Sequence, residues 1–333
     1  MRPPGCGKAD DAAGAGGPAE LTRRDPPAWT QRTRRVAPRL VTASYLAAIT
    51  ALGEFSGLKL LLFPELGALT SVVVSDPASR WARSPLLLVL TPLLTAVVGI
   101  LVSSHLPFGP AAVALAVGMG LVVLRGLRSP VAPALSAGYL PVALGIRSWT
   151  YPLAILIATA GLVLLMRLRT RGHADAIDHA ATAGPALPFP AARRWLAPLG
   201  LFLAGALLLA RLLGSHLVLY PPLLVIAWET LANGDHCPWQ RRYAALLAAT
   251  SAAAVVGLVL ARSLGSGPLA AFLAVLLTAP LLKRLGLTCP PAYAVALLPL
   301  VLPQPPWSYP LFVLAGGGWL VLVACLTHRR SEA

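Results

Sequence analysis

The sequence predicts an all-α, polytopic membrane protein with two tandem parallel repeats, each of about six helical segments, four long and two short or broken. Hydrophobic residues make up 57% of the 333-residue chain and charged residues only 12%, with a mean hydropathy of +0.73. Soluble domains carry about 25% charged residues. Many apolar runs also approach the roughly 20 residues that a helix needs to cross a bilayer. The third observation is an internal repeat, which divides the apolar segments into two equivalent sets.

The stretch from Leu127 to Leu153 recurs 158 residues later without a gap. Ten of its 27 positions are identical in the two copies, and three of the identical residues are proline. Apolar composition alone does not explain such matches. The register continues upstream, where Gly99 aligns with Gly257, and slips by one residue further back, where Phe63-Pro64 aligns with Tyr220-Pro221. We therefore predict an internal duplication.

The first repeat, residues 39–171, follows a tail, residues 1–38, that is rich in Gly, Ala, Pro and charge and is predicted to be disordered. Basic residues cluster between alternate segments, as the positive-inside rule requires of cytoplasmic loops. Six crossings then place both ends of this half in the cytoplasm. The six apolar segments cover residues 40–63, 64–79, 85–104, 110–126, 130–146 and 150–168.

A cytoplasmic linker, residues 172–194, joins the second repeat, residues 195–328, and residues 329–333 form a short tail. An even number of crossings in each half makes the two halves parallel, related by an axis along the membrane normal. We expect a multi-pass protein of the cell membrane with both termini cytoplasmic. The second-half segments cover residues 195–213, 218–232, 243–262, 268–282, 288–303 and 309–326.

The net charge of +15 does not indicate nucleic-acid binding, because the basic residues lie mostly at the ends of apolar runs and no aromatic-basic motif accompanies them. The four cysteines have neither disulfide nor zinc-site spacing. His173 and His179 lie in the linker, where nothing would fix a metal's coordination geometry. No cluster of His, Asp, Glu or Ser has catalytic spacing. We therefore expect no enzyme activity, no metal and no cofactor.

The second and fifth segments of each half are short and open with proline, at Pro64, Pro133, Pro221 and Pro290-Pro291. Proline suits the first turn of a helix, where its missing N–H costs nothing. Short, Pro-interrupted segments at corresponding positions of two halves indicate a transporter's binding site. A helix N-terminus offers unpaired N–H groups and a positive dipole end to an anion. The alternative is that these prolines only set helix kinks and close packing.

The same stretches resemble the HPP family of integral membrane proteins, named for a His-Pro-Pro motif. In the second half the resemblance rests on Thr288-Cys289-Pro290-Pro291-Ala292 and on Trp307-x-Tyr309-Pro310. The motif His is Val131 in one copy and Cys289 in the other, which puts any role of an imidazole there in doubt. In the first half it rests on Pro64-Glu65-Leu66-Gly67-Ala68, on Ser75-Asp76-Pro77 with Ser84-Pro85, and on Ser129–Ala134.

The resemblance implies a transporter or channel for a small inorganic anion, with nitrite as the substrate associated with characterised members. Its partners would be the lipid bilayer and the anion, and a homo-oligomer stays open. Two other functions also stay open, an organic-acid efflux protein and a non-transporting membrane scaffold. The substrate-binding candidates are Pro64, Gly67, Ser71, Pro133, Ala134, Ser136, Pro221, Pro290, Pro291 and Ala292.

Ionisable residues within a membrane are costly and are therefore functional candidates. Glu54 lies deep in the first segment, and we take it as the candidate proton-coupling carboxylate. The alternative is a structural ion pair between Glu54 and Lys59. Glu65 follows Pro64, where a carboxylate complements the helix dipole but would repel an incoming anion.

Overall fold

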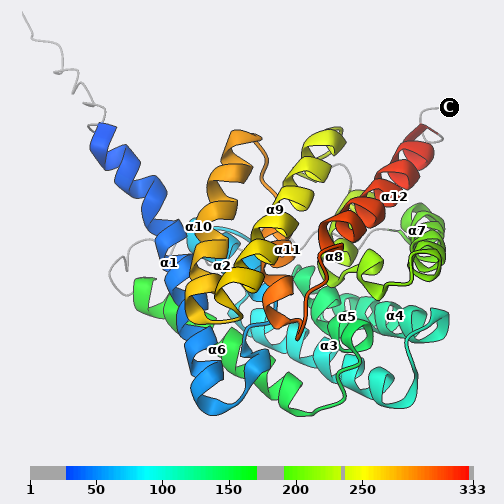
Figure 1. Cartoon of the computed structure of the whole chain (residues 1–333), viewed down its shortest axis with the longest axis horizontal. Coiled ribbons are helices and arrows are strands. Elements are labelled where there is room, and N and C mark those ends of the chain that lie inside the picture. The colour runs from blue at the N-terminus through cyan, green and yellow to red at the C-terminus, as the bar shows by residue number, and fades with distance from the viewer. Residues whose placement is uncertain (1–27, 171–190, 234–236, 330–333) are drawn as a thin grey trace, which may run out of the picture.

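The computed structural model describes residues 28–170, 191–233 and 237–329, and this part of the chain is helical with no β-strand (Figure 1). The prediction of an all-α fold is confirmed. The first half contains α1 (Ala28–Ser56), η1 (Lys59–Leu61), α2 (Glu65–Ser75), α3 (Pro85–His105), α4 (Pro110–Gly126), α5 (Pro133–Leu144) and α6 (Thr150–Thr170). The second contains α7 (Ala192–Leu212), η4 (His216–Leu219), α8 (Pro221–Ala232), α9 (Tyr243–Leu264), α10 (Pro268–Arg284), α11 (Pro291–Val301) and α12 (Tyr309–Arg329).

Helix ends follow proline and glycine. Proline stands in the first turn of α3, α4, α5, α8, α10 and α11, where no intrahelical N–H bond is lost. Gly145 ends α5 with φ of 67° in the left-handed region, which a residue without a Cβ adopts at no steric cost. The short second and fifth helices of each half, α2, α5, α8 and α11, have only 11 or 12 residues each.

The N-terminal boundaries differ from the predicted ones. Helix α1 begins at Ala28 and includes Pro38, so residues 28–38 of the predicted tail are helical. It ends at Ser56, well before residue 63, because Gly57 turns the chain with φ of 74° and η1 follows. Residues 1–27 of the predicted tail and nearly all of the predicted linker lie outside the described residues.

Within each half the third helix is the packing centre: α3 contacts α4, α5 and α6, and α9 contacts α10, α11 and α12. Glycines allow the closest approaches. A Cβ added at Gly99 would lie 2.1 Å from the Gly138 carbonyl oxygen, and one at Gly257 would lie 2.0 Å from that of Ala296. Small residues at helix interfaces let backbones approach in membrane proteins. These two contacts recur at the 158-residue spacing that the predicted duplication requires.

Buried tyrosines form a second recurring pair. The Tyr151 hydroxyl donates to the Ala137 carbonyl over 2.8 Å, and the Tyr309 hydroxyl donates to the Val295 carbonyl over 2.9 Å. Each bond ties the first turn of the last helix of a half to the middle of its short fifth helix. Both tyrosines are fully buried, so each hydroxyl needs such a partner.

The first helices of the two halves pack differently. Helix α1 runs along α10 of the other half, whereas α7 packs on α12 of its own half. The Trp319 indole of α12 donates to the Phe202 carbonyl of α7 over 3.0 Å and fills the space beside Gly205. Helices α1 and α10 lie side by side in Figure 1, and α7 lies beside α12.

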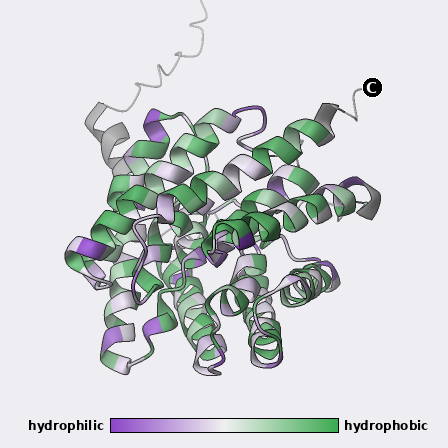
Figure 2. Ribbon diagram, turned by 45° about the vertical axis from the view of Figure 1, so that its right-hand side comes forward, coloured by the Kyte–Doolittle hydropathy of each residue, from purple (hydrophilic) through white to green (hydrophobic). Residues whose placement is uncertain are grey.

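Five helices, α3, α6, α7, α9 and α12, are long and apolar enough to cross a membrane. Figure 2 shows hydrophobic residues along the outer faces of the long helices and hydrophilic residues mainly at helix ends and in loops. Large apolar side chains are exposed there, including Leu86 at 68% and Leu212 at 71%. Apolar surface of this extent is unfavourable in water and favourable in lipid. The chain is therefore a multi-pass membrane protein.

Candidate functional site

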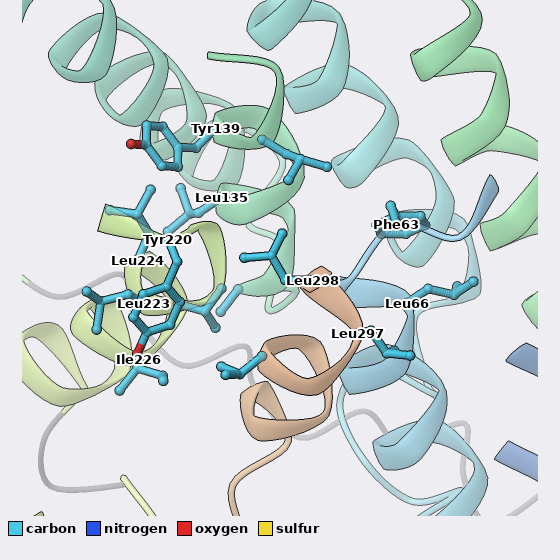
Figure 3. Close-up of a cluster of buried hydrophobic side chains, with 14 of the residues drawn as sticks. Phe63, Leu66, Leu135, Tyr139, Tyr220, Leu223, Leu224, Ile226, Leu297 and Leu298 are labelled. Atoms are coloured by element: carbon cyan, nitrogen blue, oxygen red, sulfur yellow. The ribbon is translucent and has the colours of Figure 1, made fainter. Parts of the chain in front are cut away.

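The four short helices meet at the centre of the molecule. Helix α2 contacts α5 and α11, and α8 also contacts both α5 and α11, so the four form a closed ring. Their side chains contribute to the buried cluster of Figure 3, in which Leu66 of α2, Leu135 of α5, Leu224 of α8 and Leu297 of α11 are all buried. The sequence-predicted binding segments are thus brought together.

Each short helix begins inside this core. Pro64, Pro133, Pro221 and Pro291 are all buried. The first N–H groups of the helices close tight turns with preceding carbonyls, for example Gly67 N to Pro64 O over 3.1 Å. The positive ends of four helix dipoles therefore point into the protein interior rather than to water. Such ends favour negative charge.

The chain entering α5 and α11 is held by side chains of α3 and of neighbouring loops. The Trp81 indole donates to the Pro130 carbonyl over 2.9 Å, and the Thr91 hydroxyl donates to Ser129 Oγ over 2.8 Å. On the other side, the Arg242 guanidinium donates to the Leu285 carbonyl over 2.8 Å. These bonds satisfy the non-helical backbone and nearby polar groups that precede the two short helices, which is a condition for irregular chain at membrane depth.

Glu65 lies in the first turn of α2 and is fully buried. The Ser136 hydroxyl, in the first turns of α5, donates a hydrogen bond to Glu65 Oε1. Glu65 Oε2 is buried and has no hydrogen-bond partner among the described residues. The starts of α2 and α5 therefore meet at a carboxyl group that is only half satisfied. The sequence pointed to the first-turn position of Glu65 but not to Ser136 as its partner.

The other predicted binding residues are placed as follows. A Cβ at Gly67 would lie 2.4 Å from Leu297 Cδ1, so Gly67 is where α11 packs on α2. Ala134 and Ala292 are fully buried in the first turns of α5 and α11, and Pro290 is half-buried just before α11. The Ser71 hydroxyl bonds within its own helix, to the Ala68 carbonyl over 2.8 Å.

Glu54 is not part of this centre. It lies near the end of α1 and is exposed, as is Lys59 in η1. A Cβ added at Gly267, immediately before α10, would lie 3.5 Å from Glu54 Oε1, so the Glu54 side chain lies beside the start of α10. Glu65 is the carboxyl residue that the fold buries.

Several buried hydroxyls near the short helices have no hydrogen-bond partner among the described residues. They include Thr70 of α2, Tyr139 of α5, Tyr220 just before α8 and Thr278 of α10. A buried hydroxyl without a partner loses a hydrogen bond that it had in water. Tyr220 and Thr278 were not expected from the sequence, although Tyr220 immediately precedes Pro221 and so lies at a short-helix start.

A cavity of about 530 Å³ opens at the opposite ends of α5 and α11. Its lining includes Leu144 and Leu302, which are 158 residues apart, and the polar residues Ser215, His216 and Gln304. The His216 ring stacks on Phe108 of the other half, with ring centroids 3.7 Å apart. Burial lowers the pKa of His216 below its usual value, against a hydrogen bond to the Ala143 backbone that raises it. The fold therefore favours the neutral form of this ring.

Comparison with known proteins gives one match. Residues 240–333, which contain α9, α10, α11 and α12, match the family model described as HPP, transmembrane region. No curated protein and no solved structure matches the chain. The match supports the HPP resemblance predicted from the sequence, and it covers the last four helices of the described residues, at residues 240–333.

Proposed function

We propose that this protein is a transporter or channel for a small inorganic anion of the nitrite kind, in the cell membrane, with both termini cytoplasmic. The observation that carries the proposal is the ring of four short helices that begin at buried prolines, Pro64, Pro133, Pro221 and Pro291. A ring of this kind directs four positive dipole ends into the membrane interior. The HPP resemblance supports the same class of substrate.

The physical requirement is a replacement for water. An anion that enters a bilayer must exchange its hydration shell for donors in the protein. The unpartnered hydroxyls of Thr70, Tyr139 and Tyr220 are buried on or beside the short helices and can donate to it. Hydroxyls and helix N-termini together stabilise an anion without a buried cation, which would trap it.

The cavity at the C-terminal ends of α5 and α11 is better suited to be an entrance for the anion than its binding site. Helix C-termini carry partial negative charge, which disfavours an anion at rest there. The cavity lies where both halves contribute equivalent residues, and Gln304 on its rim is exposed. An ion would pass through it to reach the ring.

The test is uptake of nitrite into proteoliposomes, with nitrate and chloride as comparison anions, with and without an inward proton gradient. Protein-dependent nitrite uptake above that of empty liposomes supports the proposal. No flux of any of the three anions would overturn it, and organic acids would be tested next. Loss of all flux with every class of anion would leave the membrane scaffold as the function.

The entrance is tested separately with Gln304→Cys. Modification of this cysteine with a bulky maleimide should slow nitrite uptake severalfold, because the label occupies the cavity. The matched control is the unsubstituted protein labelled at its own exposed Cys325, near the other end of α12. Uptake that is equally insensitive to both labels would contradict this entrance.

A further inference from the structure

Glu65 is the one carboxyl residue among the described residues that is fully buried. A buried carboxylate is costly unless it is paired or fully hydrogen-bonded. Glu65 accepts a side-chain hydrogen bond from Ser136, and its Oε2 has no partner in the described part of the chain. The protein therefore carries, at the centre of the helix ring, an acid whose ionised form is incompletely compensated.

The side chain bonded to the Glu65 carboxyl is the Ser136 hydroxyl of α5. The Tyr151 and Tyr309 hydroxyls donate to backbone carbonyls of α5 and α11, the two short helices that contact α2. Tyr293 of α11 packs beside Gly67, which follows Glu65 by two residues in α2. Helix α1 also packs on α2. Of its described ionisable side chains, Arg39 is half-buried, Tyr45 donates to the Ala158 carbonyl, and Glu54 is exposed near the helix end.

The second half has no acid at the position equivalent to Glu65; its short helix α8 carries Glu229 near its end, where Asn233 donates to the carboxylate over 3.3 Å. In the register of the repeat, Glu65 aligns with Pro222 and Ser136 aligns with Ala294. Both Pro222 and Ala294 are buried, and α8 and α11 still contact one another as α2 and α5 do. A short-helix pair of this kind thus forms without a carboxyl at the helix start, so the contact between the two helices does not itself require Glu65.

We propose that Glu65 is the proton-binding group of this protein and that its charge state controls access of the anion to the ring. The ionised carboxylate is itself an anion held at the starts of α2 and α5, where it repels the substrate. A proton from the more acidic side of the membrane forms an O–H bond on the carboxylate and removes that charge. The substrate anion then binds at the positively polarised starts of α2 and α5. Release of the anion and of the proton restores the carboxylate.

The proposal rests on the anion transport proposed above and gives it a coupling mechanism. Binding of the proton and binding of the anion favour one another, because each lowers the electrostatic cost of the other. Ser136 acts as a positioning residue, since its hydroxyl fixes the direction of the carboxyl but carries no proton across the membrane.

The experiment compares Glu65→Gln, Glu65→Asp and the matched control Glu54→Gln in proteoliposomes. The measured quantity is the ratio of initial nitrite uptake with an inward proton gradient to uptake without one. We expect a ratio above unity for the unsubstituted protein, Glu65→Asp and Glu54→Gln, and a ratio of unity with uptake retained for Glu65→Gln, because glutamine mimics the neutral acid. A gradient response that survives in Glu65→Gln, or is lost in Glu54→Gln alone, overturns the proposal.

A second measurement separates the coupling from transport. Infrared difference spectra of the protein in lipid nanodiscs are recorded on acidification, with and without nitrite. A protonated-carboxyl band that is absent in Glu65→Gln and grows with nitrite supports the proposal even if the liposome flux is too small to detect. Uptake without any gradient response overturns the coupling while the transport function stands. A Glu65 band that nitrite leaves unchanged also overturns the coupling.

Discussion

The Ser136 hydroxyl donates to Glu65 Oε1 and so joins the first turns of α2 and α5. The two residues are 71 positions apart in the chain and are both fully buried. This contact fixes the place where the two short helices of the first half meet. We expect both the stability of the fold and the proposed coupling of proton and anion transport to depend on this hydrogen bond. Substitutions of the two residues test the two effects separately.

Ser136→Ala removes the bond that Glu65 accepts and leaves its carboxyl without any hydrogen bond from a described side chain. We expect the free energy of unfolding to fall by about 1–3 kcal/mol, the usual cost of leaving a buried polar group unsatisfied. Denaturant unfolding in detergent micelles measures it. Ser71→Ala is the control, since the Ser71 hydroxyl bonds only within α2, and it should change stability by no more than about 0.5 kcal/mol. Equal effects of the two substitutions would contradict the contact.

Gly99→Ala should destabilise the first half. The added Cβ would lie 2.1 Å from the Gly138 carbonyl oxygen, so α3 and α5 must separate. Overpacking of this kind costs about 1–3 kcal/mol. Gly118→Ala in α4 is the matched control, because nothing lies within 4 Å of its Cβ position, and alanine is the better helix former. Thermal unfolding of both variants gives the comparison, and a stable Gly99→Ala protein would disprove the close packing.

Tyr151→Phe and Tyr309→Phe each remove one buried hydrogen bond to a short fifth helix. We expect each to lower the free energy of unfolding by about 0.5–1.5 kcal/mol, by similar amounts, since the bonds are 2.8 and 2.9 Å long in equally buried sites. The two sites lie in different halves, so the double variant should show the sum. A strongly unequal pair would mean that the two bonds differ in strength.

Cysteine reactivity reports on the packing around α11 and the loop before α9. Cys237 and Cys289 are buried, and burial raises the pKa of Cys237 to about 12, so neither thiol is a thiolate at pH 7. In the folded protein, a maleimide should label Cys325 quickly and these two only after unfolding. Mass spectrometry of peptides after timed labelling measures the three sites separately. Rapid labelling of Cys289 would contradict the burial of the α11 start.

Acidification tests the contact between His216 and Phe108. Because burial holds the pKa of His216 below its ordinary 6.5, the folded state favours the neutral ring. Stability from this group is therefore present above pH 6.5 and is lost as the pH falls through the lower pKa of the folded state. Unfolding measured across this range should show a smaller loss for His216→Phe, which keeps the stacked ring without the proton. Identical pH profiles would rule out a contribution from His216.

The short helices were predictable because proline marks their starts in the sequence. Pro133, Pro221 and Pro291 stand in the first turns of α5, α8 and α11, and Pro64 immediately precedes α2. The lengths of α4 and α10 also followed from the apolar runs between glycine-proline and basic residues. The tandem duplication stays a prediction, and the equivalent glycine and tyrosine contacts of the two halves agree with its register.

The choice between Glu54 and Glu65 could not be made from the sequence. Both lie within or beside apolar runs, and only the packing of other helices decides which one is buried. Glu54 is exposed because α1 ends at Ser56 and Gly57 turns the chain away. Glu65 is buried because α5 and α11, whose sequences lie far along the chain, close over the start of α2. Non-local contacts of this kind leave no local pattern.

The packing of α1 on α10 constrains the order in which the protein can assemble during synthesis. The ribosome makes α1 first, but its partner surface exists only after residues 268–284 have been made and inserted. Until then the face of α1 that packs on α10 lacks this partner. Closing so long a loop is slow. The contact between α1 and α10 can therefore form only late in synthesis, after the partners of α1 in its own half, α2 and α6, have been made.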